Sequence, residues 1–196
     1  MTKNKVKFGL KNVHWAKVYE TTGTTGTVTT YGSYTAWPGA VNMTLDAAGS
    51  ENTFFDADDG IYYTIPGANN GYTGTFESAL IPEEVKTAVF GALKDSNGVI
   101  VEGSDDKIAP IALAYQFDGD TENRFVTLYK VQLNRPGTTD ATKPSEGGAT
   151  PQTESVTFSA IPRPDDNKIK ATTGDTTSTS TKEGWFNAVY VPTVST

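Results

Sequence analysis

The clearest pattern in the sequence is a set of short segments in which apolar and polar residues alternate, as they do in half-buried β-strands. Residues 40–46, 71–81 and 155–161 show it best. In the first two segments, the apolar residues expected on one face are Val41, Met43, Leu45, Tyr72, Phe76 and Leu80. The small or polar residues expected on the opposite face of the three segments are Asn42, Thr44, Asp46, Thr73, Thr75, Glu77, Thr157 and Ser159. Such strands have one face on a core and the other in water.

The rest of the chain predicts further strands and one helix. The other strands are expected at 11–20, 54–65 (two pieces around an acidic turn), 96–103, 109–117, 124–133, 167–172 and 185–191, with 109–117 and 124–133 forming a hairpin. The helix is expected over about 82–91, because Pro82 suits the first helical position and Gly91 can end the helix. Many short strands with one flanking helix indicate a mainly β protein, an antiparallel β-sandwich or barrel.

Two long polar stretches interrupt this pattern. Residues 135–153 include "TDATKPSEGGATPQT" and contain no large apolar side chain. Residues 172–184, "TTGDTTSTSTKEG", are too polar to pack in a core. Both are predicted to be long loops of a single domain over residues 1–196, because no linker separates two cores.

Composition narrows the functional classes. Nine Phe, nine Tyr and three Trp supply one sizeable core, and the lack of Cys excludes disulfides and thiolate metal sites. The net charge of −7 and the scattered Lys and Arg argue against a surface that binds nucleic acid. No apolar stretch predicts a secretory signal or a membrane span, so no membrane partner is expected.

Candidate chemistry is sparse. His14, the one histidine, lies beside Trp15 inside a predicted strand and is expected to be a partly buried structural residue. The clusters "DADDG" at 56–60 and "DGDTE" at 118–122 space carboxylates as calcium loops do, but the first lacks the closing Glu, and solvated turns are the favoured interpretation. The sequence has no nucleophile elbow and no phosphate loop. We therefore expect no enzyme, no catalytic residue, no metal and no cofactor.

Several segments occur in an order that is more informative than any single site. They are "KVKFGLKNVHWAKV", "PGAVNMTLD", "FFDADDGIYY", "NGYTGTFESALIPEEVKTAVFG", "IALAYQFDGDTENRFVTLYKVQLNRP" and "TPQTESVTFSAIPRPDD". Together they resemble the major tail proteins, or tail tube proteins, of long-tailed siphophages and prophages of Gram-positive bacteria. The likeness extends to about residue 172, with a weaker match at "GWFNAVYVP".

This resemblance implies a tail-tube β-sandwich with a flanking helix. Copies of the chain would form hexameric rings, and stacked rings would form a hollow tube through which DNA passes. The partners would be further copies of the chain, together with tape measure, tail terminator and baseplate or distal tail proteins. The protein would be assembled in the host cytoplasm and reside in the tail of the virion. Some family members carry an additional C-terminal immunoglobulin-like domain, which is not expected here.

Two surfaces receive roles from this interpretation. The eight polar strand residues from Asn42 to Ser159 become candidates for lining the lumen, where an acidic surface would repel DNA phosphates. The candidates for a loop that bridges stacked rings are Thr139, Lys143, Pro144, Glu146, Thr150 and Gln152. The alternatives are that the polar faces meet bulk solvent and that the loop is a tolerated surface insertion.

Two other functional classes remain open from the sequence. One is a monomeric β-sandwich binding or adhesin module that uses an exposed Trp37 or Trp185 to stack on a ligand. The other is a hydrolase that uses two carboxylates, which would need a cleft with two convergent acids.

Overall fold

The computed structural model describes residues 8–24, 26–118, 123–142 and 151–193, and strands dominate these ranges. The elements in chain order are β1 (Phe8–Gly23), β2 (Gly26–Tyr31), β3 (Thr35–Ala36), β4 (Ala40–Gly49), β5 (Thr53–Ala57), β6 (Gly60–Ile65), β7 (Asn69–Ser78), α1 (Glu83–Ala88), β8 (Leu93–Lys94), β9 (Ile100–Val101), β10 (Ile111–Asp118), β11 (Phe125–Leu133), β12 (Glu154–Ala160), β13 (Lys170–Thr172) and α2 (Thr179–Glu183). The predicted mainly β architecture is confirmed.

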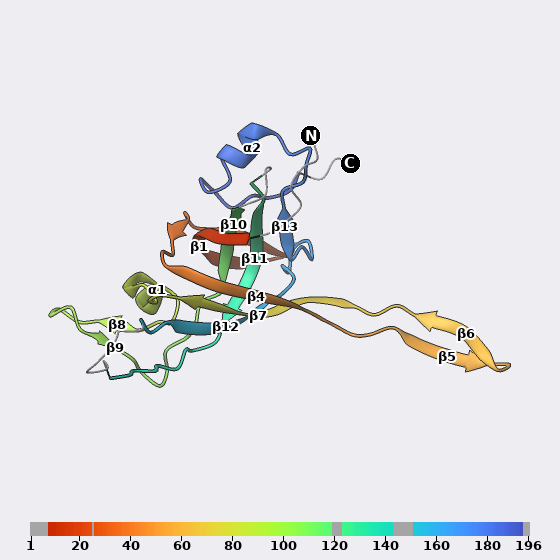
Figure 1. Cartoon of the computed structure of the whole chain (residues 1–196), viewed down its shortest axis with the longest axis horizontal. Coiled ribbons are helices and arrows are strands. Elements are labelled where there is room, and N and C mark those ends of the chain that lie inside the picture. Colours follow the sequence, from red (N-terminus) through yellow and green to blue (C-terminus); the bar gives the residue numbers. More distant parts are fainter. Residues whose placement is uncertain (1–7, 25, 119–122, 143–150, 194–196) are drawn as a thin grey trace.

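One antiparallel sheet of nine strands organises the molecule (Figure 1). Its strand order is β2-β1-β10-β11-β12-β7-β4, with β3 paired to β1 and β13 paired to β11. The predicted hairpin of 109–117 and 124–133 is confirmed as β10 and β11, which pair in antiparallel register. Although β4 and β1 are far apart in the strand order, they contact each other, so the sheet bends around its core.

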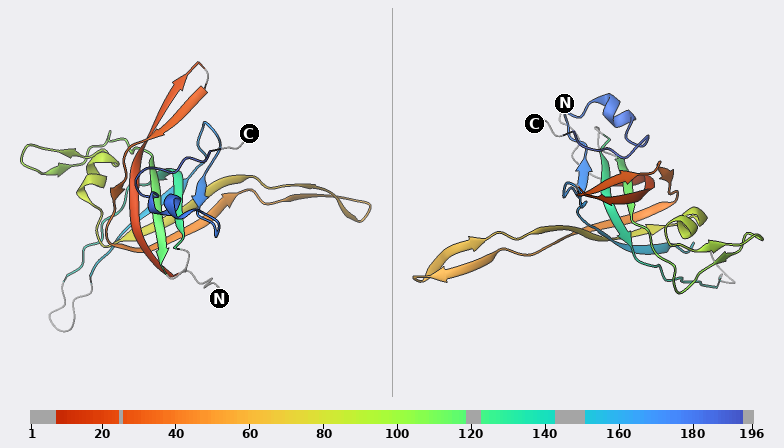
Figure 2. Two further views of the ribbon diagram at one scale, coloured as in Figure 1. Left: turned by 90° about the horizontal axis from the view of Figure 1, so that it is seen from above. Right: turned by 180° about the vertical axis from the view of Figure 1, so that it is seen from behind.

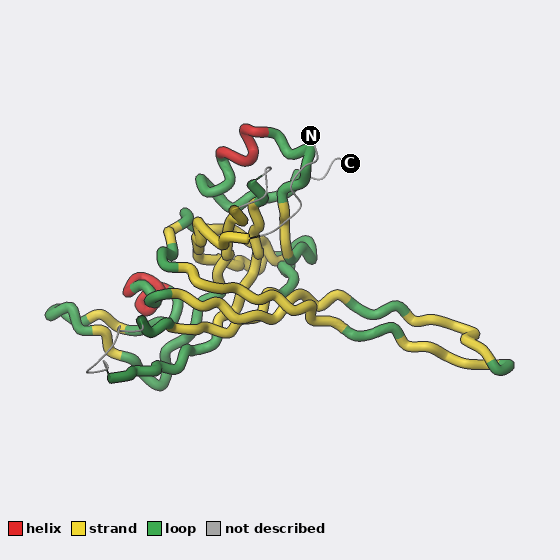
Figure 3. Tube along the Cα trace, viewed as in Figure 1, coloured by secondary structure: helices red, strands yellow, loops and turns green. Residues whose placement is uncertain are grey.

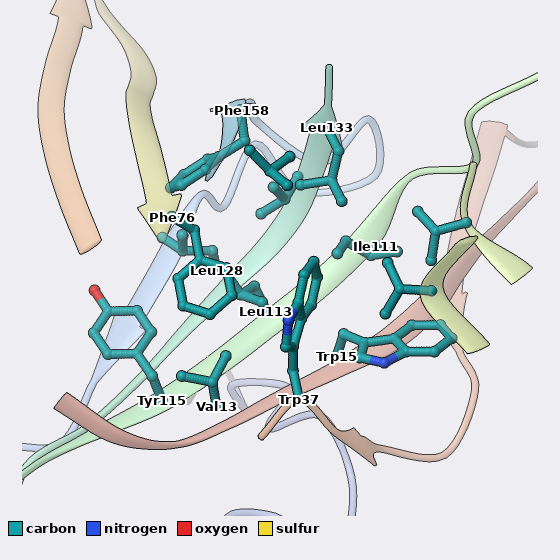
Figure 4. Close-up of a cluster of buried hydrophobic side chains, with 14 of the residues drawn as sticks. Val13, Trp15, Trp37, Phe76, Ile111, Leu113, Tyr115, Leu128, Leu133 and Phe158 are labelled. Carbon is teal, nitrogen blue, oxygen red and sulfur yellow. The ribbon is translucent and has the colours of Figure 1, made fainter. Parts of the chain in front are cut away.

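The main core fills the inside of this bend (Figure 4). Trp37 is only 1% exposed and packs edge-on against Phe76, with ring centroids 5.0 Å apart. Its indole N–H donates to Ser78 Oγ at 3.3 Å, which satisfies the one polar atom of this buried side chain. A smaller cluster that includes Ala112, Tyr129 and Val189 lies outside the main core. The central strands β10 and β11 are therefore covered on both faces, as their nearly continuous burial requires.

The helix α1 is shorter than the predicted 82–91. Pro82 occupies its N-cap position, and Val85 is its buried side chain. The helix ends before Val89, and Gly91 adopts a φ of 81°, a conformation that does not continue a helix. Val89 and Phe90 are nevertheless buried, so the apolar residues beyond the helix still contribute to the core.

The C-terminal region differs from the prediction in two ways. Residues 172–184 were expected to be an unstructured polar loop, but they contain the short helix α2, in which Thr181 N donates to Ser178 Oγ at 3.2 Å as an N-cap. The strand expected at 185–191 does not form. Trp185 is instead buried and stacks on Tyr190, with ring centroids 5.1 Å apart. The apolar residues of this segment therefore cover the sheet without pairing with one of its strands.

Two residues of the alternating pattern were assigned to the wrong face. Val41 is exposed, because the pairing of β4 with β7 shifts between Ala40 and Asn42 and leaves Val41 as the extra residue of a β-bulge. Leu80 is exposed, because β7 ends at Ser78 and the alternation does not continue past that residue.

Three hairpins extend from the body (Figures 1 and 2). The longest continues from β4 and β7 and carries β5 and β6 at its tip; we call residues 50–68 the arm. Figure 3 shows that the arm consists of two chain segments running side by side, with no third segment against them. The hairpin of β8 and β9 lies at the opposite end of the longest axis of the molecule, and the hairpin of β1 and β2 projects in a third direction.

Candidate assembly surfaces

The strand register places all eight predicted lumen residues on one face of the sheet. In antiparallel strands, directly paired residues share a face. The pairings across β4, β7 and β12 form three rows, which are Asn42–Glu77–Ser155, Thr44–Thr75–Thr157 and Asp46–Thr73–Ser159. We call these nine residues the polar face. The sequence identified eight of them and missed Ser155, which the same alternation could have supplied.

The polar face is acidic and hydrogen-bonded. Its ionisable residues are Asp46 and Glu77, and it contains no Lys, Arg or His. Glu77 accepts a hydrogen bond from the Thr153 hydroxyl, and Thr157 Oγ1 accepts one from Asn134 Nδ2 at 2.9 Å. These bonds hold polar groups in place on a surface that faces away from the core. Its role as a lumen lining stays a prediction.

The reverse side of the same strands packs on the core. Here Met43 pairs with Phe76, and Leu45 pairs with Gly74, which in turn pairs with Phe158. Gly74 is required by close approach, because a Cβ at this position would collide with the Thr44 carbonyl oxygen and lie 2.8 Å from the Phe158 ring. One face of the three strands therefore anchors them to the body, and the polar face remains available.

The predicted bridging loop lies between β11 and β12, as the sequence indicated. Thr139 and Gln152 are exposed at its two ends. The candidates Lys143, Pro144, Glu146 and Thr150 lie outside the described residues. The bridging role therefore stays a prediction.

The arm is an antiparallel ribbon that closes on an acidic turn. Ala57 pairs with Gly60, and the two residues between them, Asp58 and Asp59, have φ values of 52° and 61°. Positive φ at both central residues is typical of the type I′ turn that suits two-residue hairpin loops. The cluster "DADDG" thus forms a turn at the tip of the arm, as predicted.

The arm exposes more large apolar side chains than any other described hairpin. They are Phe54, Phe55, Ile61, Tyr62, Tyr63 and Ile65, and Tyr62 reaches 72% exposure. Phe55 pairs with Tyr63, and Thr53 with Ile65, on one face of the ribbon, while Phe54 lies on the other. Two strands have no third layer to cover both faces, so these side chains lack a core of their own.

The sequence did not assign a role to the arm residues. The strand pattern at 54–65 was recognised, but its projection was not. A usable signal was present, because adjacent apolar residues in both strands of a short hairpin put apolar side chains on both of its faces.

A groove runs between β4 and β10, where the bent sheet does not close. It comprises two adjoining cavities of about 240 and 300 Å³, which share the lining residues Met43, Leu45, Tyr115 and Phe117. We call it the seam groove. Two cations, Arg124 and Lys170, line its second cavity. Arg124 donates to Asp175 at 3.0 Å, and Lys170 Nζ lies 4.1 Å from the centroid of the Tyr72 ring.

A buried arginine fastens the base of the β1–β2 hairpin to the body. Arg163 donates from Nε to Asp166 Oδ1 at 2.8 Å, and a second bond joins its Nη2 to Asp166 Oδ2. Its Nη1 donates to the Tyr31 hydroxyl in β2 at 3.2 Å, and its guanidinium lies 4.8 Å from the centroid of the Tyr129 ring in β11. One side chain therefore joins the turn after β12 to β2 and β11.

The charges of this cluster support one another. Burial opposes the charge on Arg163, but its hydrogen bonds to Asp166 and Tyr31 hold its pKa above the ordinary value. Burial likewise opposes the charge on Asp166, but hydrogen bonds from Arg163 and from the Lys168 amide hold the pKa of that carboxyl below its usual range. This cluster is not predicted by the sequence, because nothing in the local pattern "PRPDD" shows that the arginine is buried.

The remaining candidates do not form a reactive site. His14 is half-buried, with Nδ1 2.9 Å from the Asn12 carbonyl oxygen and its ring 4.5 Å from that of Phe186. Trp37 and Trp185 are 1% and 3% exposed, so neither offers the stacking surface that a binding module would need. Among the described residues, no three His, Cys, Asp or Glu side chains group as metal ligands would. Most of the cluster "DGDTE" lies outside the described ranges.

Two adjacent glutamates of α1, Glu83 and Glu84, line an open depression of about 720 Å³. Consecutive helical residues point in different directions, and Glu83 forms an ion pair with Lys94. This depression therefore does not supply two facing acids. None of the described helices is long and apolar enough to cross a membrane.

Comparison with known proteins adds no assignment. No protein-family model matches this sequence, and no curated protein matches it significantly.

Proposed function

We propose that this chain is the structural subunit of a phage tail tube, which assembles into hexameric rings that stack around an acidic lumen for DNA. The order of sequence segments that resembles the major tail proteins of long-tailed phages supports this proposal. The bent antiparallel sheet with a short flanking helix is compatible with the tail-tube fold that the resemblance implies.

The observation that supports the proposal most strongly is the exposed apolar surface of the arm. Its six large apolar side chains are 52–72% exposed, and covering the exposed part of each on association would stabilise the assembly by about 1–2 kcal/mol before the entropy of association is subtracted. Exposed apolar surface of this kind marks an interaction site. The proposed tube supplies the missing surface from neighbouring copies of the same chain.

The edges of the sheet support a ring. Strands β2 and β4 stand at the two ends of the strand order, and each has one hydrogen-bonded neighbour within the described part of the sheet. Unpaired strand edges favour pairing with another chain, and repeated heterologous contacts close into a ring. In the ring, β2 offers the open edge, because β4 already lies against β1 of its own chain.

The polar face lines the lumen in this proposal. It presents hydroxyls, amides and the carboxylates of Asp46 and Glu77, and it has no cation to bind phosphate. A basic lining would gain one phosphate contact after another and retain DNA, whereas an acidic lining repels the backbone and lets it pass. The tape measure, tail terminator and baseplate or distal tail proteins are the further partners, and the virion tail is the site of action.

The test is electron microscopy of the purified protein, with light scattering over a wide range of concentration. We expect rings or tubes with an open centre at high concentration. The matched variant replaces the arm, residues 50–68, with a two-residue Asn-Gly turn, which joins Gly49 and Asn69, the last paired residues of β4 and β7. This variant should fold, with a melting temperature close to that of the full chain, and should not assemble.

A full-length protein that stays monomeric at every concentration and salt condition contradicts the proposal. Assembly of the arm-deleted variant into the same tubes contradicts the role given to the arm.

A further inference from the structure

The arm and the seam groove have complementary compositions. The arm is a narrow ribbon that carries aromatic side chains on both faces. The seam groove consists of two adjoining cavities, and the residues common to both, Met43, Leu45, Tyr115 and Phe117, are apolar or aromatic. Three of these four residues are only partly buried although they pack against the main core, so the groove is an opening of that core to the surface.

Their charges are also complementary. The arm contains four carboxylates, Glu51, Asp56, Asp58 and Asp59, and no Lys, Arg or His. The wall of the seam groove carries Arg124 and Lys170. Lys170 has no carboxylate partner among the described residues, and its ammonium group lies over an aromatic ring instead. An acidic apolar ribbon would therefore bring both apolar contact and counter-charge to this wall.

The arm cannot fill the groove of its own chain. It continues the line of β4 and β7 away from the body, and in both views of Figure 2 its tip is at the far end of the molecule. β4 forms one side of the seam groove and continues along the chain into the arm. The arm therefore begins beside the groove and extends away from it. The ribbon that enters the groove must come from another molecule.

We propose that the tip of the arm of one copy docks in the seam groove of a second copy. The aromatic side chains of β5 and β6 cover Met43, Leu45 and Phe117, and the carboxylates of the arm face Lys170. This inference rests on the proposed function, because the second copy is then a neighbouring subunit of the tube. It adds to that function a defined receptor surface for the arm.

Cysteine cross-linking tests the contact directly, because the natural chain contains no cysteine that could react. One sample of protein carries Tyr62→Cys in the arm and a second carries Leu45→Cys in the groove. After mixing under assembly conditions and mild oxidation, we expect a disulfide-linked dimer of the two variants. The control pairs Tyr62→Cys with Leu93→Cys; Leu93 is 66% exposed, and so more accessible than the partly buried Leu45, but it lies on the hairpin of β8 and β9. That pair should give at least tenfold less cross-linked product.

A charge exchange provides an independent measurement. Lys170→Glu and Asp56→Lys should each raise the concentration needed for assembly, and the chain that carries both changes should recover most of the loss. Circular dichroism of each variant confirms that it is folded. The docking proposal is overturned if tubes form without the Tyr62–Leu45 cross-link. It is also overturned if the double variant needs a concentration for assembly as high as the two single losses added together. Either result leaves the tube proposal intact. Cross-linked dimers that never grow into rings support the docking contact and contradict the tube.

Discussion

Replacement of Arg163 by methionine tests whether the buried arginine cluster stabilises the fold. The side chain of Arg163 is only 3% exposed, and methionine keeps much of its length while removing the charge and every donor. Removing one member of a buried ion pair costs about 3–5 kcal/mol, because the other charge loses its partner. Asp166 is 31% exposed and keeps the Lys168 amide as a donor, so water can replace part of the lost interaction. We therefore expect a loss of about 3 kcal/mol.

For a chain of this length, that loss corresponds to a fall in melting temperature of about 6–12 °C. Urea denaturation at neutral pH measures the free energy of unfolding. Arg135→Met is the matched control, because Arg135 pairs with Glu102 at 3.0 Å but the two side chains are 36% and 58% exposed. An exposed pair of this kind contributes about 0–1 kcal/mol.

The dependence on pH separates the ion pair from packing. The pKa of Asp166 is lower in the folded protein than in the unfolded chain, where an aspartate has a pKa of about 3.9. Its stabilising effect is therefore present above that value and is lost as the pH falls through the lower, folded pKa. The difference between the natural protein and Arg163→Met should narrow in this acidic range. A loss below about 1 kcal/mol at neutral pH, or one equal to that of Arg135→Met, would refute the reasoning.

Three further changes test other parts of the structure. Gly74→Ala should cost about 1–3 kcal/mol or more in urea denaturation, because its Cβ would collide with the Thr44 carbonyl oxygen and crowd the Phe158 ring, whereas Gly137→Ala, which has open space, should cost little. Burial raises the pKa of Tyr34 to about 12, so its contribution to stability is complete below about pH 10 and is lost as the pH rises to about 12; Tyr34→Phe should reduce this alkaline loss in pH-dependent melts. Glu77→Lys should leave tube assembly intact but slow DNA ejection from phage particles, most strongly at low ionic strength. Failure to assemble would place Glu77 in a subunit interface, and normal ejection at all salt concentrations would place it on the outer surface.

The arm shows where prediction from the sequence stops. The apolar pieces and acidic turn at 54–65 predicted a hairpin, because local pattern and turn chemistry depend on neighbouring residues. Whether a hairpin lies on the body or projects from it depends on which distant residues cover it. The pairing of β4 with β7 continues only to Gly49 and Asn69, and beyond that point no other part of the described chain lies against the ribbon.

In the C-terminal region, the sequence predicted a strand that the structure does not contain. Residues 185–191 have the composition of a strand, but none of the described strands pairs with them, and Trp185 is buried against Phe125 instead. A strand-like composition shows that residues suit a buried environment. It does not distinguish a strand in a sheet from a segment that covers the sheet, because both are buried.

The sequence by itself determined the mainly β class, the position of most strands along the chain and the polar side of each of β4, β7 and β12, because a strand alternates its side chains with a period of two residues wherever it lies. Only the tertiary structure decided the register that sets Asn42, Glu77 and Ser155 in one row, and the bulge that turns Val41 outward. It also decided the burial of Trp37 and Arg163 and the opening between β4 and β10. These features depend on contacts between residues far apart in the chain. When two segments are equally apolar, the local pattern does not specify which distant segment each of them contacts.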